Sequence, residues 1–258
     1  MSLFLRTTAL MLLVLSRAPA FAAVPLISES APEVNESQQD QLSSKLFKHS
    51  LSGLYGIQST NTQPLQPYND FEVLYSKAHQ AQFELETLCK SAALLTSTEA
   101  YFAGVKSRDR ALTKIAHELD GRTDRITDLA RATIVANDVP SLVEAYEVLN
   151  REATIVKVKN RFKSPGASGY RDLNLLVQLP KTNVIAEVQL HLKAIADVKN
   201  GPEHELYEKI QQFERNAASE RRALNEFEMA KIAQFRRQSI QLYQNAWQPY
   251  ITTHIQAA

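Results

Sequence analysis

The chain has 258 residues and a near-neutral balance of 29 basic and 28 acidic side chains. A protein that coats nucleic acid or a membrane surface carries a broad excess of positive charge, so this balance argues against both classes and allows only a local basic site. Cys89 is the single cysteine, which excludes an intramolecular disulfide. Its apolar helical setting favours an inert buried thiol.

The N-terminus has the pattern of an export signal. Arg6 precedes an apolar run from Ala9 to Leu15, and the Ala20-Phe21-Ala22 tripeptide places small residues where a signal peptidase would cut. The run is too short to span a bilayer. We therefore expect residues 1–22 to be a secretory signal peptide, and the mature protein to be periplasmic or secreted, with no stable membrane insertion.

The remaining sequence predicts a lead-in and one folded domain. Residues 23–68 are rich in Ser, Gln, Asn and Pro without periodicity, which predicts a flexible lead-in. From residue 69 onward, apolar spacing and turn signals predict a series of helices and strands. They are helices over 69–95, 109–119 and from 138, a short strand within 127–136, strands over 154–162, 172–179 and 184–192, and a helical tail from Pro202. This order predicts one α+β domain over residues 69–258.

Charged side chains alternate in the predicted strands. The stretch "IVKVKNRFKSPGASGY" begins at Ile155 and carries a cation at every second position, namely Lys157, Lys159, Arg161 and Lys163. In an extended chain these four share one face. A half-buried strand with a basic outer face explains this pattern as well as a phosphate site does. In "VIAEVQLHL", Glu187, Gln189 and His191 likewise share a face.

A sheet face that combines carboxylates with cations is poor core material, because unpaired buried charge is costly. It suits a nucleoside triphosphate and its metal, since phosphoryl transfer requires cations on the phosphates, an acid to hold Mg²⁺ and a carboxylate at the attacking hydroxyl. Asp128 and Glu187 are the candidates for the acidic roles. A basic cluster around the start of a predicted helix could form an anion cradle, although basic helix starts are frequent. Its members are Lys106, Arg108, Arg110 and Lys114.

Four segments, in this order, resemble motifs of the synthetase domain of the RelA/SpoT family, the (p)ppGpp alarmone synthetases. They are "VKSRDRALTKI", "ITDLARATIV", "NRFKSPGASGY" and "EVQLHLKAI", and the resemblance covers roughly residues 100–210. It implies a mixed β-sheet flanked by helices, followed here by long C-terminal helices. It also implies an ATP-dependent nucleotide 3′-pyrophosphokinase, which transfers the β,γ-pyrophosphate of ATP to the 3′-hydroxyl of an acceptor nucleotide, usually GDP or GTP.

The resemblance also implies roles for individual residues. Asp128 falls on the family's Mg²⁺-binding aspartate and Glu187 on the glutamate at the acceptor hydroxyl, so these two are the expected catalytic and metal-binding pair. The basic cluster falls in the ATP-binding segment. Arg161 and Lys163 match an "RFK" element that contacts phosphates, and Tyr170 matches the tyrosine that stacks on the acceptor base. The further positions expected on the acceptor side are Asn174, Gln189 and His191.

The departures from the family pattern concern the acceptor. Thr133 stands where the family commonly has an arginine, and Arg131 lies two residues earlier. The usual lysine, asparagine and histidine of the acceptor pocket become Gly166, Ser168 and Asn174, so another nucleotide or a tRNA end stays open as the acceptor. Two functions remain: an exported pyrophosphokinase that acts as a toxin or effector, and a catalytically degenerate nucleotide- or partner-binding module. The C-terminal helices would offer a surface for oligomerisation.

Overall fold

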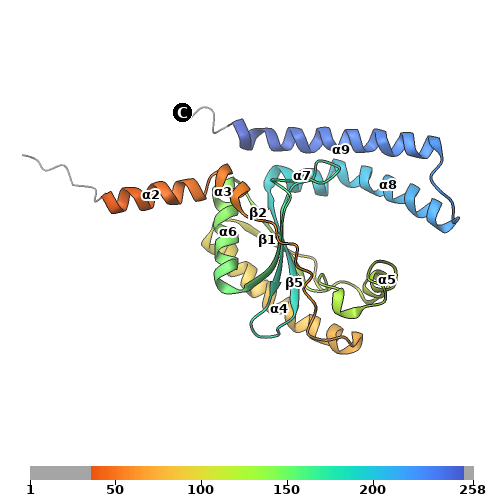
Figure 1. Ribbon diagram of the computed structural model, residues 1–258, viewed down its shortest axis with the longest axis horizontal. Coiled ribbons are helices and arrows are strands. Elements are labelled where there is room, and N and C mark those ends of the chain that lie inside the picture. The colour runs from red at the N-terminus through yellow and green to blue at the C-terminus, as the bar shows by residue number, and fades with distance from the viewer. Residues whose placement is uncertain (1–35, 253–258) are drawn as a thin grey trace, which may run out of the picture. The chain divides into compact units, whose positions relative to one another are not determined.

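The computed structural model describes residues 36–252 (Figure 1). The chain divides into two units, residues 1–41 and residues 42–258, and the second holds the sheet and the sites. The predicted signal peptide lies outside the described residues. In chain order the elements are α2 (Glu36–Lys48), α3 (Leu51–Gly56), α4 (Phe71–Leu95), β1 (Glu99–Phe102), α5 (Arg108–Glu118), η1 (Thr123–Arg125), β2 (Arg131–Ala136), α6 (Val139–Glu152), β3 (Thr154–Asn160), β4 (Leu173–Gln178), β5 (Ile185–Leu192), α7 (Lys193–Asn200), α8 (Pro202–Ser219) and α9 (Glu226–Thr252).

The sheet has five strands in the order β1-β2-β5-β4-β3. β2 and β5 run parallel and the other neighbours run antiparallel, so the sheet is mixed and the predicted α+β class is confirmed. The predicted strands over 127–136, 154–162, 172–179 and 184–192 correspond to β2, β3, β4 and β5. The edge strand β1 was not predicted, because four residues are too few to establish a period of two.

One face of the sheet is apolar and is covered by α4 and α6, which lie together on one side of the strands in Figure 1. Both helices have side-chain caps at their first turns: Asp70 accepts from the backbone N–H of Val73, and Asp138 accepts from that of Ser141. Alternate strand residues meet the apolar faces of these helices in the main core. They include Ala132, Ile134, Leu173, Leu175, Val177, Val188 and Leu190 from the strands and Leu85, Leu142 and Leu149 from the helices.

A second, smaller core fixes α5 against the N-terminal half of α4. Leu74 and Ala78 of α4 pack with Ala111 and Ile115 of α5 and with Leu129, which precedes β2. Because α5 carries much of the basic cluster, this packing sets where those cations can reach.

The prediction of a flexible lead-in is wrong for residues 49–68. Helix α3 is capped by Ser50, and the extended segment after it runs along β3, where Thr60 N–H donates to the carbonyl of Val158 at 2.9 Å. Gln66 is buried and bonds to the backbone of Ile126 and Ile185. Polar side chains bonded to distant backbone leave no periodic signal in the sequence, so pattern analysis missed the segment.

The predicted helical tail consists of two long helices, α8 and α9, which lie side by side in Figure 1. They are preceded by α7, a short helix that was not predicted. Arg222 in the break makes a bidentate ion pair with Glu228 in the first turn of α9, at 2.7 and 2.8 Å. Tyr243 and Trp247 of α9 enter the main core. No helix within residues 36–252 is long and apolar enough to cross a membrane.

Candidate active site

A row of polar side chains crosses all five strands on the sheet face opposite α4 and α6. The paired Cα positions run from Tyr101 to Thr133, then to Gln189, Asn174 and Lys159. Residues that pair directly across neighbouring strands project to the same face. The cations of β3 and the polar residues of β5 therefore share a face, as their alternation predicted.

The neighbouring row brings a cation beside the candidate base. Arg131 of β2 pairs with Glu187 of β5, and Glu187 pairs in turn with Leu176, which pairs with Lys157. Asn174 is buried and its Nδ2 donates to Glu187 Oε1 at 2.7 Å. This bond fixes one carboxylate oxygen of Glu187 and leaves the other without a hydrogen bond to any described residue.

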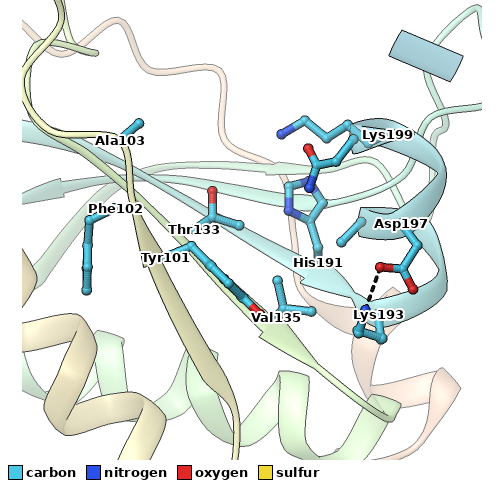
Figure 2. A pocket seen from close by; sticks show the side chains of 11 residues that line it. Tyr101, Phe102, Ala103, Thr133, Val135, His191, Lys193, Asp197 and Lys199 are labelled. Atoms are coloured by element: carbon cyan, nitrogen blue, oxygen red, sulfur yellow. Dashed lines mark hydrogen bonds and ion pairs between the residues drawn. The ribbon is translucent and has the colours of Figure 1, made fainter. Parts of the chain in front are cut away.

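Two adjoining cavities open over β1, β2 and β5. One, of about 420 Å³, lies between these strands and α7, and Figure 2 shows Thr133, His191 and Lys199 around it. The other, of about 260 Å³, contains Arg131, Glu187 and Gln189 in its lining. Tyr101, Ala103, Thr133 and Lys199 line both cavities. Glu187 therefore stands at the wall of a space large enough for part of a nucleotide.

Asp128 is held by two lysines of the basic cluster. The Nζ atoms of Lys106 and Lys114 donate to Asp128 Oδ2 at 2.9 and 2.8 Å. Burial of the carboxyl opposes its ionisation, but the hydrogen bonds from Lys114 and Lys106 outweigh burial and hold the pKa of Asp128 below its usual value. The lysines reach Asp128 because the second core docks α5 beside it and because Lys106 N–H bonds to the carbonyl of Leu129.

The donor set around Asp128 suits a nucleotide-bound Mg²⁺ better than a metal held by protein alone. Within the described part of the chain, no three His, Cys, Asp or Glu side chains gather as metal ligands. Asp128 Oδ1 is buried and has no hydrogen-bond partner in the structure. Mg²⁺ in nucleotide sites takes one or two carboxylates and completes its shell with phosphate oxygens and water. A free carboxylate oxygen on Asp128 and another on Glu187 fit that requirement.

The structure does not bring the whole predicted site together. Arg108 turns to Glu72 on α4 and stacks over Phe71 at 5.2 Å, and Arg110 is exposed. Asp128 lines neither cavity. It stands two residues before Ala130, whose carbonyl accepts from Glu187 N–H at 3.0 Å, so the backbone just before β2 connects Asp128 to the strand that carries Glu187.

In the predicted strand over 154–162, the alternation of cations ends earlier than expected. β3 stops at Asn160, whose side-chain oxygen accepts from the N–H groups of Phe162 and Lys163 and starts a turn. Arg161 and Lys163 therefore belong to this turn. Arg161 forms a bidentate pair with the buried Asp172 at 2.6 and 2.8 Å, whereas Lys163 is exposed.

Tyr170 lies in a buried polar network. Its hydroxyl donates to Asp172 Oδ2 at 2.8 Å and bonds to His191 Nε2 at 2.5 Å. Arg161 lies over the ring at 5.2 Å, and Tyr243 of α9 meets it edge-on at 5.6 Å. Burial raises the pKa of Tyr170 and lowers that of His191 to about 3, so both groups are neutral at pH 7.

Tyr101, Arg131 and Lys199 are lining residues to which the sequence analysis assigned no role. Tyr101 and Lys199 lie on elements that were not predicted, β1 and α7. Arg131 was noted only as a departure from the family pattern. Its spacing of two residues from Thr133 on a strand was the signal that both face the same cavity.

Alarmone synthetases are among the solved structures with a similar fold. The type VI effector Tas1, solved in complex with its immunity protein, aligns with a TM-score of 0.51 at 23% identity over 69% of this chain and 96% of that chain. Small alarmone synthetase 2 of Bacillus subtilis aligns with a TM-score of 0.52 at 20% identity over 69% of this chain and 94% of that chain. The resemblance to the RelA/SpoT synthetase domain is thus confirmed at the level of the fold.

Two characterised proteins are similar in sequence. The (p)ppApp synthetase toxin Tas1 of Pseudomonas aeruginosa (strain UCBPP-PA14) is 31% identical over 121 residues, which cover 47% of this chain and 27% of the toxin. GTP pyrophosphokinase YwaC of Bacillus subtilis (strain 168) is 32% identical over 95 residues, which cover 34% of this chain and 45% of that enzyme. The chain thus matches less than half the length of either relative. No known protein-family profile matches it.

Proposed function

We propose that the protein is an ATP-dependent nucleotide 3′-pyrophosphokinase of the GTP diphosphokinase type. The observation that carries this proposal is the placement of Glu187 in a cavity wall, fixed by Asn174 and paired across the strands with Arg131. A carboxylate held in this way beside a cation is suited to take a proton during pyrophosphate transfer to a hydroxyl, and Asp128 is the proposed second acid. The sequence similarity to two pyrophosphate-transferring enzymes supports it.

The proposed reaction assigns one task to each acid. The 3′-oxygen of the acceptor attacks the β-phosphorus of ATP, the bond from that phosphorus to the bridging oxygen of the α-phosphate breaks, and AMP leaves. Glu187 accepts the proton of the attacking hydroxyl through its free oxygen. Asp128, with Lys106 and Lys114 beside it, stands on the ATP side. Mg²⁺, when bound at the free Oδ1 of Asp128, would neutralise charge on the transferring phosphates.

The acceptor is an adenine or guanine nucleotide in this proposal. The two sequence relatives, a (p)ppApp synthetase and a GTP pyrophosphokinase, are named for adenine and guanine nucleotides respectively. Asn174 and Gln189 are the proposed acceptor-side contacts because both lie in the polar row beside Glu187. GDP and GTP, the acceptors implied by the RelA/SpoT resemblance, would place the protein in guanosine tetraphosphate metabolism, and a tRNA end is the nucleic-acid alternative.

We also infer that the protein acts outside the cell that makes it. The sequence of residues 1–22 supports export, and one sequence relative is a toxin. ATP is scarce outside the cytoplasm, so an exported pyrophosphokinase would work as an effector delivered into a target cell. The catalytic domain in this proposal is residues 69–258, extended by the packed segment 49–68.

The proposal is tested with residues 23–258, ATP, Mg²⁺ and a panel of GDP, GTP, AMP, ADP, ATP and tRNA, with products scored by mass for an added pyrophosphate. Glu187→Gln keeps the size and the bond to Asn174 but cannot take a proton, so we expect turnover to fall by about 10²-fold or more while ATP affinity stays within about threefold. Glu152→Gln, at the exposed end of α6, is the matched control. Full activity in Glu187→Gln would refute the site assignment.

One observation favours a second candidate, a nucleotide-binding module without turnover. Arg161 and Tyr170, the residues expected to contact phosphate and base, are both engaged with Asp172 inside the protein. This module would bind ATP yet form no product with any acceptor in the panel. Binding of its partner would also be unchanged by Asp128→Ala.

A further inference from the structure

Helix α7 carries a cation over the polar face of the sheet. The helix follows directly on β5, so its last turn folds back along the strand. Lys199 in that turn lines both cavities. Figure 2 shows its side chain extending from α7 over the ring of His191. Lys199 Nζ donates to Gln189 Oε1 at 3.0 Å, which places the ammonium two residues along β5 from Glu187.

This ammonium is only partly satisfied. It has three N–H donors and makes one hydrogen bond with the described residues. It forms no ion pair with them, although Asp172 and Glu187 lie close enough to interact with it electrostatically. Burial lowers the pKa of Lys199, because a desolvated ammonium without a carboxylate partner is costly. A cation kept in a cavity at such a cost is suited to an anionic ligand.

A comparison within α7 supports this reading. Lys193, at the start of the same helix and in the same cavity wall, is neutralised by Asp197 at 2.5 Å, as the dashed line in Figure 2 marks. Arg131 in the adjoining cavity resembles Lys199 instead: its Nε is buried without a partner, and no described carboxylate forms an ion pair with it. The two cations that flank Glu187 and Gln189, Arg131 and Lys199, therefore have no carboxylate partner among the described residues.

We propose that Lys199 binds a phosphate group of a nucleotide that enters this cavity, with the ammonium turning from Gln189 to the phosphate oxygens. The proposal deepens the proposed function, on which it rests for the class of ligand. The phosphate belongs either to ATP or to the acceptor nucleotide, and the two are distinguished by measuring each alone. Lys199 would thus be a substrate-binding residue contributed by α7, outside the strands that carry the two acids.

The test is calorimetric titration of wild-type residues 23–258 and of Lys199→Met with ATP, GDP, adenosine and guanosine, each separately. We expect Lys199→Met to weaken the binding of ATP or of GDP by about ten- to a hundredfold, the loss of one charge-assisted contact. Nucleoside binding should not change, because a nucleoside has no phosphate. The nucleotide that loses affinity is the one whose phosphate Lys199 holds.

Two further variants separate charge from shape. Lys209→Met removes an exposed cation of α8 that lines neither cavity, and it should leave both affinities within about twofold. Lys199→Arg keeps the charge and should keep affinity within about fivefold, even if Lys199→Met proves too unstable to titrate. The proposal is overturned if Lys199→Met binds both nucleotides as the wild type does, if nucleosides lose affinity equally, or if Lys199→Arg loses as much as Lys199→Met.

The same titrations distinguish this proposal from the proposed function. Suppose that the wild type binds nucleotide, that Lys199→Met does not, and that no acceptor yields product. The proposed role of Lys199 is then supported, and the proposed pyrophosphokinase activity is refuted. If product forms and the KM of each nucleotide is the same for the wild type and Lys199→Met, the pyrophosphokinase activity is supported and the proposed role of Lys199 is refuted.

Discussion

At the scale of single residues, Asp128 combines a structural and a proposed catalytic task. Its Oδ2 accepts from two lysines that come from different segments, so the carboxylate joins the stretch before α5, α5 itself and the stretch before β2. The side chains of Asp128 and Lys106 are only 14% and 12% exposed, so water screens this cluster poorly. Removing the negative charge would leave two ammonium groups facing each other.

We therefore expect Asp128→Asn to lower the free energy of unfolding by about 1–3 kcal/mol in addition to any loss of activity. Urea denaturation at pH 7 measures this, with Asp109→Asn, an exposed change on α5, as the control. An Asp128→Asn protein as stable as the wild type would mean that the lysines are held in place by other contacts.

At the scale of elements, the junction between α8 and α9 depends on one carboxylate. Glu228 accepts two hydrogen bonds from Arg222 and one from the backbone N–H of Asn225. These hydrogen bonds, and those from Arg222 above all, lower the pKa of Glu228 to about 2. From this junction α9 runs back to the main core, where Tyr243 contacts Tyr170.

The pH dependence of this junction follows from the direction of the shift. A carboxyl with a depressed pKa stabilises the fold above its unfolded pKa of about 4.3, and the contribution disappears as pH falls toward the folded value. We expect Glu228→Gln to lower the melting temperature at pH 7, and the difference from wild type to shrink between about pH 4.5 and pH 2. Glu226→Gln in the same turn is the control. A constant difference across that range would contradict the assignment.

At the scale of the whole molecule, the segment before α4 links the second core to the β-sheet. Gln66 is 5% exposed, and its amide bonds to the carbonyls of Ile126 and Ile185 and to the N–H of Ile185. Ile126 belongs to the second core and Ile185 begins β5. The Gln66 side chain therefore links the second core, which holds α5 and its basic cluster, to β5, the strand that carries Glu187.

Gln66→Leu would fill similar space but leave three buried backbone groups without their partner. We expect it to lower the free energy of unfolding by about 2–4 kcal/mol, measured by urea denaturation of residues 23–258. The exposed neighbour Gln63→Leu should change it by less than about 0.5 kcal/mol. Equal stability of the two variants would show that water or another group replaces the amide.

Structural features that repeat along the chain could be predicted from the local sequence pattern. The period of helix α4, the alternation in β3 and β5, and the polar face that carries Lys159, Gln189 and Glu187 could all be predicted from the sequence, because side-chain direction follows from backbone geometry. The resemblance to alarmone synthetases predicted the fold and the candidate roles of Asp128 and Glu187. The short elements β1 and α7 escaped prediction, and so did residues 49–68, whose bonds reach distant backbone.

Only the tertiary structure decided which charges are free. Sequence treats Arg108, Arg161, Lys193 and Lys199 as equivalent cations, yet three of them are neutralised, by Glu72, Asp172 and Asp197. Lys199 has no such partner among the described residues and faces a cavity. The reason is physical: the state of a charge depends on its partner and its burial, and both are set by residues that are distant in the sequence and adjacent only after folding.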